Sequence, residues 1–414
     1  MANSFYITDL ADPQLSDLQR AALAAATAHP VTLTEEAVLE AARQATGLSD
    51  FGDDSFRDRL AGWVRAAREQ TNLSPVGQAA IWGDMVRYLV ARLQFEDFAK
   101  RHPEIAEVPL PRPIIVGGLP RSGTTNLLQL LAGDPRLRSL PYWEAIRPVG
   151  EFYMKDGVDQ RHALCAAEWA QRDELMPVIK SIHEFSPDHI SEDVELAAMD
   201  FGTYWPDWAV RGPSWVEYEA THDRVPWLAY MRRVMQGLSY QRGPNQWVSK
   251  CPQHMEQLDA VMKVFPDATM VLTHRDPVAS VQSMLTAAAY SARLTCKTVD
   301  KPGIIAFVVD RYERLMRRCV EQHDSVPSDQ MVDIYFHEYM ADRDGTLEKV
   351  YDAAGLPFDD ATRQAIDAVA AHNKRGRHGQ LLYDLRGDFG IDPAELRKRF
   401  DFYMDRFPVA IEVK

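Results

Sequence analysis

The stretch PIIVGGLPRSGTT, residues 113–125, carries the strongest structural signal in the chain. It begins with an apolar run typical of a buried β-strand, passes through a glycine-containing turn, and ends where a helix can start. Gly118 and Gly123 have the spacing of the phosphate-binding loop G-x-x-x-x-G-K-[ST]. Thr124 stands where the lysine belongs, and Arg121 supplies a positive charge from within the loop. The stretch therefore predicts a site for a phosphate-like anion that differs from an ordinary ATPase loop.

The residue types in this loop fit an anion site. Backbone N–H groups at the start of the expected helix point toward one spot, and the helix dipole favours negative charge there. The hydroxyl groups of Thr124 and Thr125 are placed to donate two further hydrogen bonds. The Arg121 guanidinium adds a fixed charge and a planar fork of donors. A purely structural turn is the alternative, and the strand–loop–helix context favours the anion site.

The composition is that of an ordinary soluble globular protein with an acidic surface. Of the 414 residues, 46% are hydrophobic and 26% charged, and the formal net charge is -14. Such a surface repels nucleic acid and anionic membranes as a whole, so an anionic ligand needs a local cluster of Arg and Lys. No apolar run suffices to span a bilayer, and the N-terminus lacks the pattern of a secretory signal. With its scattered cysteines, the chain is expected to be cytoplasmic.

The pattern of the chain divides at about residue 110. Residues 1–110 read as a helical N-terminal extension, with one helix capped by Thr34 and ending at Gly47, and another opened by Ser74-Pro75. A helical cap on the core is the plain interpretation of this extension, and a homodimer contact or an acceptor lid is the alternative. Residues 111–414 form the α/β domain, in which a Trp-rich helical insertion occupies about 150–245.

Short buried strands alternate with helices in the α/β domain. This alternation predicts a P-loop-like three-layer sandwich with a central parallel sheet. Ligands of such sheets bind at the carboxyl ends of the strands. The expected strands cover residues 114–117, 247–249, 269–273 and 331–335.

Positively charged residues follow the ends of other expected strands. Arg275 ends the strand VLTHR, and Ser283 lies eight residues later in the next helix, so a turn between them lets both hold a second phosphate. Lys250, in WVSKCP, leaves another strand toward the same edge of the sheet. A basic turn, KRGRHG, occupies residues 374–379. A surface salt bridge for Arg275 and a solvated basic loop at 374–379 are the plain alternatives.

Together these motifs resemble the sulfotransferase superfamily, and within it the bacterial family related to tyrosylprotein and carbohydrate sulfotransferases. Residues 120–125 match the loop P-[RK]-[ST]-G-[ST]-[TS], which in that family holds the 5′-phosphosulfate of 3′-phosphoadenosine 5′-phosphosulfate (PAPS). Arg275 and Ser283 match the family's 3′-phosphate site, and Lys250 matches its K-[SC]-P lysine. The resemblance implies that PAPS, and its product PAP, bind through Arg121, Ser122, Gly123, Thr124, Thr125, Arg275, Ser283, Lys374, Arg375 and Gly376.

The match departs from the family pattern in two places. The C-terminal R-K-G-x-x-G clamp is matched loosely at residues 374–379, where the two basic residues are exchanged. In the segment that resembles Y-E-x-L, Phe336 and His337 replace the tyrosine and the acid, which puts a tyrosine contact to the nucleotide there in doubt. The resemblance covers roughly residues 111–390.

The reaction that the resemblance implies is in-line transfer of a sulfuryl group from PAPS to a hydroxyl or amine. Lys250 and Arg121 are expected to stabilise the charge that develops on the leaving oxygen. A general base must take the proton of the acceptor. Glu144 is the first candidate, because the related tyrosylprotein enzymes carry a catalytic glutamate shortly after the helix that follows the anion-binding loop. The reserve candidates for the base are His183, His189 and Glu192.

The absence of the loop lysine also affects whether a metal is expected and which other functions remain open. A kinase needs that lysine and Mg²⁺ for its β- and γ-phosphates, whereas PAPS carries less charge there, so no metal is expected. An atypical P-loop kinase is one alternative, and the Arg275–Ser283 pair counts against it. A non-catalytic nucleotide-binding module is another, and Lys250 counts against it because simple binding has no obvious need of that lysine.

The identity of the acceptor is indicated only by the insertion. Its tryptophans suit an apolar small molecule or lipid, with the plain alternative that they fill a hydrophobic core. They are Trp169, Trp205, Trp208, Trp215 and Trp227.

Overall fold

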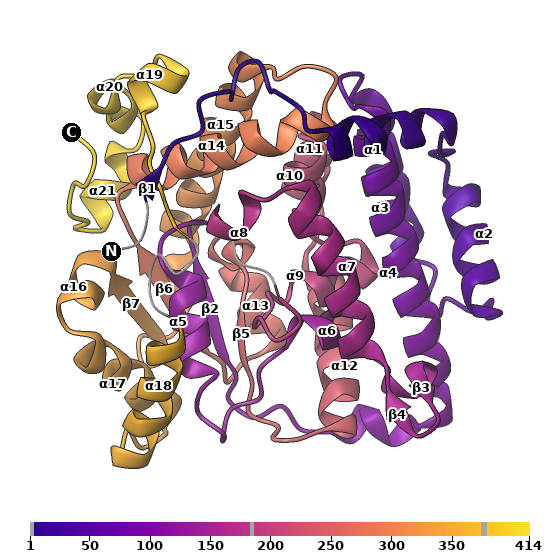
Figure 1. Cartoon of the computed structure of the whole chain (residues 1–414). Helices are drawn as coiled ribbons and strands as arrows, with labels where there is room; N and C mark the ends of the chain where they lie inside the picture. The colour runs from indigo at the N-terminus through magenta and orange to yellow at the C-terminus, as the bar shows by residue number, and fades with distance from the viewer. Residues whose placement is uncertain (1–3, 183–185, 374–378) are drawn as a thin grey trace.

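The computed structural model describes residues 4–182, 186–373 and 379–414, and its centre is a parallel sheet. The four strands are ordered β5-β2-β6-β7 (Figure 1). They are β2 (Ile114–Gly118), β5 (Val248–Lys250), β6 (Thr269–His274) and β7 (Met331–Tyr335). Each expected strand is confirmed, with ends that differ from the expected ones by at most one residue.

Apolar side chains cover both faces of this sheet. Ile114 and Val116 of β2 point to one face, where they pack with α5 (Thr124–Leu131), α17 (Arg343–Ala354) and α18 (Asp360–His372). Ile115 points to the opposite face and joins the larger core of the remaining helices. Because period-2 alternation places apolar groups on both sides, the sheet must be covered twice. The expected α/β sandwich with a central parallel sheet is therefore confirmed.

The register of the strands aligns their carboxyl ends. Val116 of β2 lies opposite Lys250 of β5, and Gly118 lies opposite Thr273 of β6. The loop after β2 consequently emerges beside Lys250 on one side and Thr273 on the other.

The N-terminal helices pack against the insertion and α14 (Pro277–Thr295) rather than forming a separate core (Figure 1). Thr34 caps its helix by accepting a hydrogen bond from the Ala37 N–H, and Gly47 ends it with a left-handed φ of 70°. Ser74 caps α4 in the same way. Both expected helix starts are confirmed, while the domain boundary near residue 110 stays a prediction. The helices are α1 (Asp17–Ala28), α2 (Glu35–Thr46), α3 (Phe56–Glu69) and α4 (Pro75–Arg101).

The insertion is helical, and most of its tryptophans serve the core. Trp169, Trp215 and Trp227 are buried, whereas Trp205 and Trp208 are half-buried. Core filling is thus the right interpretation for three of the five. Helix α6 (Tyr142–Ala145) precedes the insertion. The helices of the insertion are α7 (Arg161–Leu175), α8 (Ile179–Ile182), α9 (Val194–Ala197), α10 (Trp205–Ala209), α11 (Pro213–Thr221) and α12 (Val225–Gln241).

Further helices complete the layers around the sheet. They are α13 (Leu258–Val264), α14 (Pro277–Thr295), α15 (Lys301–Gln322), α16 (Phe336–Ala341), α19 (Leu385–Phe389), α20 (Pro393–Lys398) and α21 (Asp401–Arg406). Two small pairings, parallel β1 (Ser4–Phe5) with β8 (Gln380–Leu381) and antiparallel β3 (Met154–Lys155) with β4 (Val158–Asp159), lie outside the central sheet. In the described ranges, no helix combines the length and the apolarity needed to cross a membrane.

A buried charge network ties the insertion to α15. Arg311 donates to both carboxylate oxygens of Glu256, at 2.8 and 2.6 Å, and to Asp207 at 2.5 Å. Burial raises the pKa of Glu219 to about 8 and that of Asp207 to about 6. Burial alone would also raise the pKa of Glu256, but the charges of Arg224 and Arg311 outweigh it and hold that pKa below its usual range. Arg311 therefore compensates several carboxyl groups in the interior.

Replacing Arg311 by Met should destabilise the fold strongly. The substitution leaves buried carboxylates without their main cation, so we expect the free energy of unfolding to fall by about 3–5 kcal/mol. Urea denaturation monitored by circular dichroism measures this change. Arg318→Met is the matched control on the same helix, because its exposed pair with Glu321 should contribute less than about 1 kcal/mol. Equal effects of the two substitutions would contradict the role of the network.

Candidate active site

The loop between β2 and α5 turns through residues with left-handed backbone angles. Gly118, Arg121 and Gly123 have φ values of 138°, 73° and 97°. A Cβ on Gly118 would lie 2.2 Å from Thr273 Oγ1, so only glycine fits there. Gly123 is the residue before α5, and its φ sets the direction in which the helix begins. The glycine spacing seen in the sequence is thus required by the turn itself.

Neighbouring elements hold this loop in place. Ser122 Oγ donates to the Leu119 carbonyl at 2.6 Å and lies 2.5 Å from Thr273 Oγ1, while its N–H also donates to Leu119. The Tyr312 hydroxyl of α15 donates to the Pro120 carbonyl at 3.1 Å. Ser122 was expected to bind the nucleotide, but the structure engages both its N–H and its hydroxyl in closing the turn.

Lys250 meets the start of α5 and a glutamate from the insertion. Its Nζ donates to Thr125 Oγ1 at 3.2 Å and pairs with Glu192. Lys250 is only 1% exposed, so its charge requires a nearby partner. We call Thr125, Glu192 and Lys250 the Lys250 cluster. It brings together a cation, a hydroxyl and a carboxylate at the end of the sheet where the loop emerges.

Asp193, the residue after Glu192, fixes the position of the chain around Glu192. The Asp193 N–H donates to the Lys250 carbonyl at 3.1 Å, and the Asp193 carboxylate contacts His254 Nε2 at 2.8 Å. Asp193 and His254 are both buried. This contact fixes the Glu192 segment to the segment that follows Lys250, so the Lys250 cluster is supported by its surroundings.

Arg121, Arg275 and Ser283 lie together beside the loop. Arg121 Nε donates to Ser283 Oγ at 3.2 Å, and Arg275 Nη1 donates to the Arg121 carbonyl at 2.6 Å. The Ser283 hydroxyl also donates to Tyr383 at 3.0 Å. The sequence predicted that Arg275 and Ser283 hold one phosphate together, and the structure brings both residues into contact with Arg121. Their binding of a phosphate stays a prediction.

The Arg275 side chain is held on both sides. Its guanidinium lies 4.1 Å above the centre of the Phe336 ring, the residue that replaces the family tyrosine. Its Nε and Nη2 donate to the two carboxylate oxygens of Glu412, at 2.7 and 2.6 Å. Glu412 lies near the C-terminus and carries no motif, so sequence reasoning did not find it. Tyr383 was missed for the same reason.

Glu144 is not part of the Lys250 cluster. Its carboxylate accepts from Arg138 Nη2 at 2.8 Å and from Arg242 Nη2 at 2.9 Å, and the residue is 2% exposed. The Arg138 carbonyl accepts from the N–H of Val248, the first residue of β5, whereas Lys250 is the last. Glu144 therefore belongs to a buried ion pair beside the start of β5, which corrects the expectation that it faces the reacting groups.

The other expected residues fall into two groups. His189 contacts Gln129 of α5 through Nδ1 at 3.2 Å. His183, together with the basic turn that contains Lys374, Arg375 and Gly376, lies outside the described residues. Glu192 is the base candidate that contacts Lys250 directly.

Comparison with known proteins assigns the chain to a family. Residues 113–360 match the sulfotransferase family, which covers the loop, Lys250, Arg275 and Ser283. The chain belongs to the sulfotransferase family. The resemblance read from the motifs is thereby confirmed.

Solved structures of mycobacterial sulfotransferases share the fold of this family member. It superposes on sulfotransferase STF1 from Mycobacterium tuberculosis H37Rv with a TM-score of 0.78 and 27% identity, covering 89% of this chain and 98% of that one. For STF9 from Mycobacterium avium the TM-score is 0.81 at 25% identity, with 92% and 99% covered. The sulfotransferase fold thus extends over the N-terminal helices as well as the sheet.

A curated relative is similar in sequence over a shorter stretch. It is the omega-hydroxy-beta-dihydromenaquinone-9 sulfotransferase Stf3 of Mycobacterium bovis, 22% identical over 271 residues. The alignment covers 59% of this chain and 63% of the relative.

Proposed function

We propose that this protein transfers a sulfuryl group from PAPS to a hydroxyl or amine group of an apolar small molecule or lipid. The observation that carries the proposal is the contact of Lys250 with Thr125 and Glu192 at the end of the anion-binding loop. A buried lysine, a helix-start hydroxyl and a carboxylate together supply a charge stabiliser, an anion donor and a proton acceptor.

The residues of the loop suit the 5′-phosphosulfate. Arg121 brings a guanidinium, and Thr124 and Thr125 bring hydroxyl groups at the first turn of α5. Arg275 and Ser283 suit the 3′-phosphate, with Ser283 hydrogen-bonded to Arg121. In this proposal Ser122 shapes the loop without touching the nucleotide. The expectation that no metal takes part stays a prediction.

The reaction uses the Lys250 cluster. The acceptor oxygen or nitrogen attacks sulfur, the bond from sulfur to the phosphate oxygen breaks, and its electron pair stays on PAP. Lys250 neutralises the charge that develops on this leaving oxygen. Glu192 takes the acceptor's proton, a role for which its contact with Lys250 favours it over Glu144.

Apolar side chains beside the Lys250 cluster support an apolar acceptor. Cys251, the residue after Lys250, packs with Val194, Tyr204 and Trp208 of the insertion. The relative Stf3 is named for a menaquinone derivative, which accords with an acceptor of this kind. The cytoplasmic location and a homodimer stay predictions.

Lys250→Met should lower turnover with PAPS by at least about 100-fold. The methionine keeps most of the side-chain volume but removes the charge that stabilises the leaving oxygen. The measurement is the initial rate of PAP formation with an acceptor found by mass spectrometry. Arg318→Met, on the outer face of α15, should retain wild-type turnover. A near-normal rate in Lys250→Met would refute the assigned mechanism.

Glu192→Gln and Glu144→Gln separate the two candidates for the base. We expect kcat to fall at least about 100-fold in Glu192→Gln, because glutamine cannot accept the proton. Glu144→Gln should change kcat by less than about threefold while lowering the melting temperature, because it weakens a buried ion pair. Steady-state kinetics and thermal unfolding of both variants provide the measurement. The reverse kinetic pattern would restore Glu144 as the base.

A further inference from the structure

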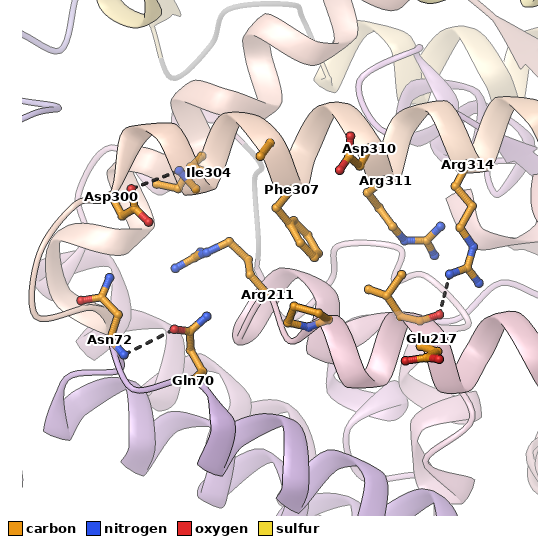
Figure 2. A pocket seen from close by; sticks show the side chains of 14 residues that line it. Gln70, Asn72, Arg211, Glu217, Asp300, Ile304, Phe307, Asp310, Arg311 and Arg314 are labelled. Carbon is orange, nitrogen blue, oxygen red and sulfur yellow. Dashed lines mark hydrogen bonds between the residues drawn. The ribbon is translucent and has the colours of Figure 1, made fainter.

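A surface cleft lies between α15, α11 and the segment that follows α3 (Figure 2). Its volume is about 580 Å³, within the range of small-molecule sites. Ile304 and Phe307 of α15 line it together with Pro213 and Val216 of α11. The walls are therefore mainly apolar, and they suit the hydrocarbon or aromatic body of a ligand.

Arg211 projects into this cleft with unused hydrogen-bond donors (Figure 2). Its Nη2 lies 2.8 Å from Cys296 Sγ, and sulfur is a weak acceptor. Arg311 and Arg314 also line the cleft, but both lie within ion-pair distance of Glu256. Within the described residues, Arg211 forms no ion pair with a carboxylate, and its side chain contacts Cys296 Sγ instead.

The backbone holds Arg211 in an unusual conformation. Its φ is 51°, which non-glycine residues seldom adopt. Its N–H donates to the carbonyls of Pro206 and Asp207, at 3.2 and 3.1 Å. Asp207 is in turn fixed by Arg311. A strained residue that is stabilised by its surroundings and directed into an apolar cleft is a feature of ligand sites.

Acidic side chains at the same cleft restrict what binds there. Asp300 accepts from the Gly303 N–H at 3.0 Å, and Asp310 is paired with Arg399 at 2.6 Å. Glu217 is exposed. These carboxylates repel a polyanion, so the cleft suits a ligand with a single anionic group that can reach Arg211.

Aromatic rings separate this cleft from the loop after β2. Phe307 meets Trp208 edge to face at 6.1 Å between ring centres, and Trp208 meets Tyr312 at 6.4 Å. Tyr312 in turn donates to the loop at Pro120. The cleft is thus next to the candidate active site without sharing its residues.

We propose that the cleft binds an apolar small molecule that carries one anionic group, with the anion on Arg211 and the apolar body against Phe307. A carboxylic acid and a sulfate ester both have this chemistry. The second would be the product of the proposed reaction, but the site itself does not depend on that reaction.

Calorimetric titration of the full chain with 4-phenylbutyrate and neutral 4-phenylbutanol tests the site. A charge-assisted hydrogen bond predicts that the carboxylate binds at least about tenfold more tightly than the alcohol. Arg211→Gln should abolish this preference, and Arg318→Gln should keep it. An unchanged preference in Arg211→Gln, or no preference in the wild type, would overturn the proposal.

A cleft-filling variant and a second anion complete this test. Ala306 is exposed and lines the cleft, so Ala306→Trp should abolish binding of both compounds without lowering the melting temperature. Retained binding in that variant would place the ligand elsewhere and refute the site. Comparison with 3-phenylpropyl sulfate shows which of the two anions the site prefers.

A second feature of the structure is the contact between Arg275 and the carboxylate of Glu412 in the C-terminal segment. Glu412 occupies two donors of Arg275, and the Arg121 carbonyl occupies a third. The N–H groups of Glu412 and Val413 donate to the buried Asp276 carboxylate, at 2.9 and 3.1 Å. The contact is therefore built by several bonds beside Arg275.

We infer that Glu412 is a residue of the nucleotide site that takes the place of the 3′-phosphate and must leave when the nucleotide binds. This inference rests on the proposed function, in which Arg275 holds that phosphate. A carboxylate presents two oxygens to a guanidinium much as a phosphate does. The segment thus sets the affinity for nucleotides that carry a 3′-phosphate.

Titration with PAP and with AMP, which lacks the 3′-phosphate, tests the role of Glu412. Glu412→Gln should bind PAP about threefold to tenfold more tightly than the wild type and should bind AMP with unchanged affinity. Glu395→Gln, an exposed change in the same C-terminal region, should alter neither. Equal or weaker PAP binding by Glu412→Gln would refute the competition. If neither the wild type nor either variant bound PAP, the proposed function itself would be refuted.

Discussion

A lysine buried at the end of a β-strand is the constraint on which the site depends. The Lys250 side chain is almost inaccessible to water, and a charge in that position is strongly unfavourable without a partner. Glu192 supplies the opposite charge and Thr125 a hydrogen-bond acceptor. Because the three residues come from the sheet, the insertion and the loop helix, their contact fixes how these parts of the chain meet.

The rest of the site follows from the parallel sheet. The strand register places the loop after β2 between the ends of β5 and β6, and this alone puts Lys250 and Thr273 on either side of the loop. Arg275 follows β6 and binds the loop through the Arg121 carbonyl. The order and register of the parallel strands thus bring together the positive charges that an acidic chain needs to bind an anionic ligand. Short strands suffice, because only their ends carry the chemistry.

Much of this arrangement could be predicted from the sequence, because its signals are local. The glycine spacing fixed the loop, and charged residues directly after apolar strands pointed to Lys250 and Arg275. The proposed preference for Glu192 over Glu144 as the base could not be derived in that way. Both are glutamates outside the strands, and only tertiary packing pairs Glu144 with Arg138 and Arg242, and Glu192 with Lys250. Glu412 lies 137 residues from Arg275 in the chain and has no motif, so their contact also required the structure.

The central claim is that the Lys250 cluster is a sulfuryl-transfer centre. Incubating the protein with PAPS and a small-molecule extract, followed by mass spectrometry, tests it most directly. The account predicts a compound that gains one sulfuryl group, formed together with an equal amount of PAP, in reactions with the wild type and not with Lys250→Met. Product formation that is equal in both proteins, or PAP binding with no sulfated product from any extract, would contradict it.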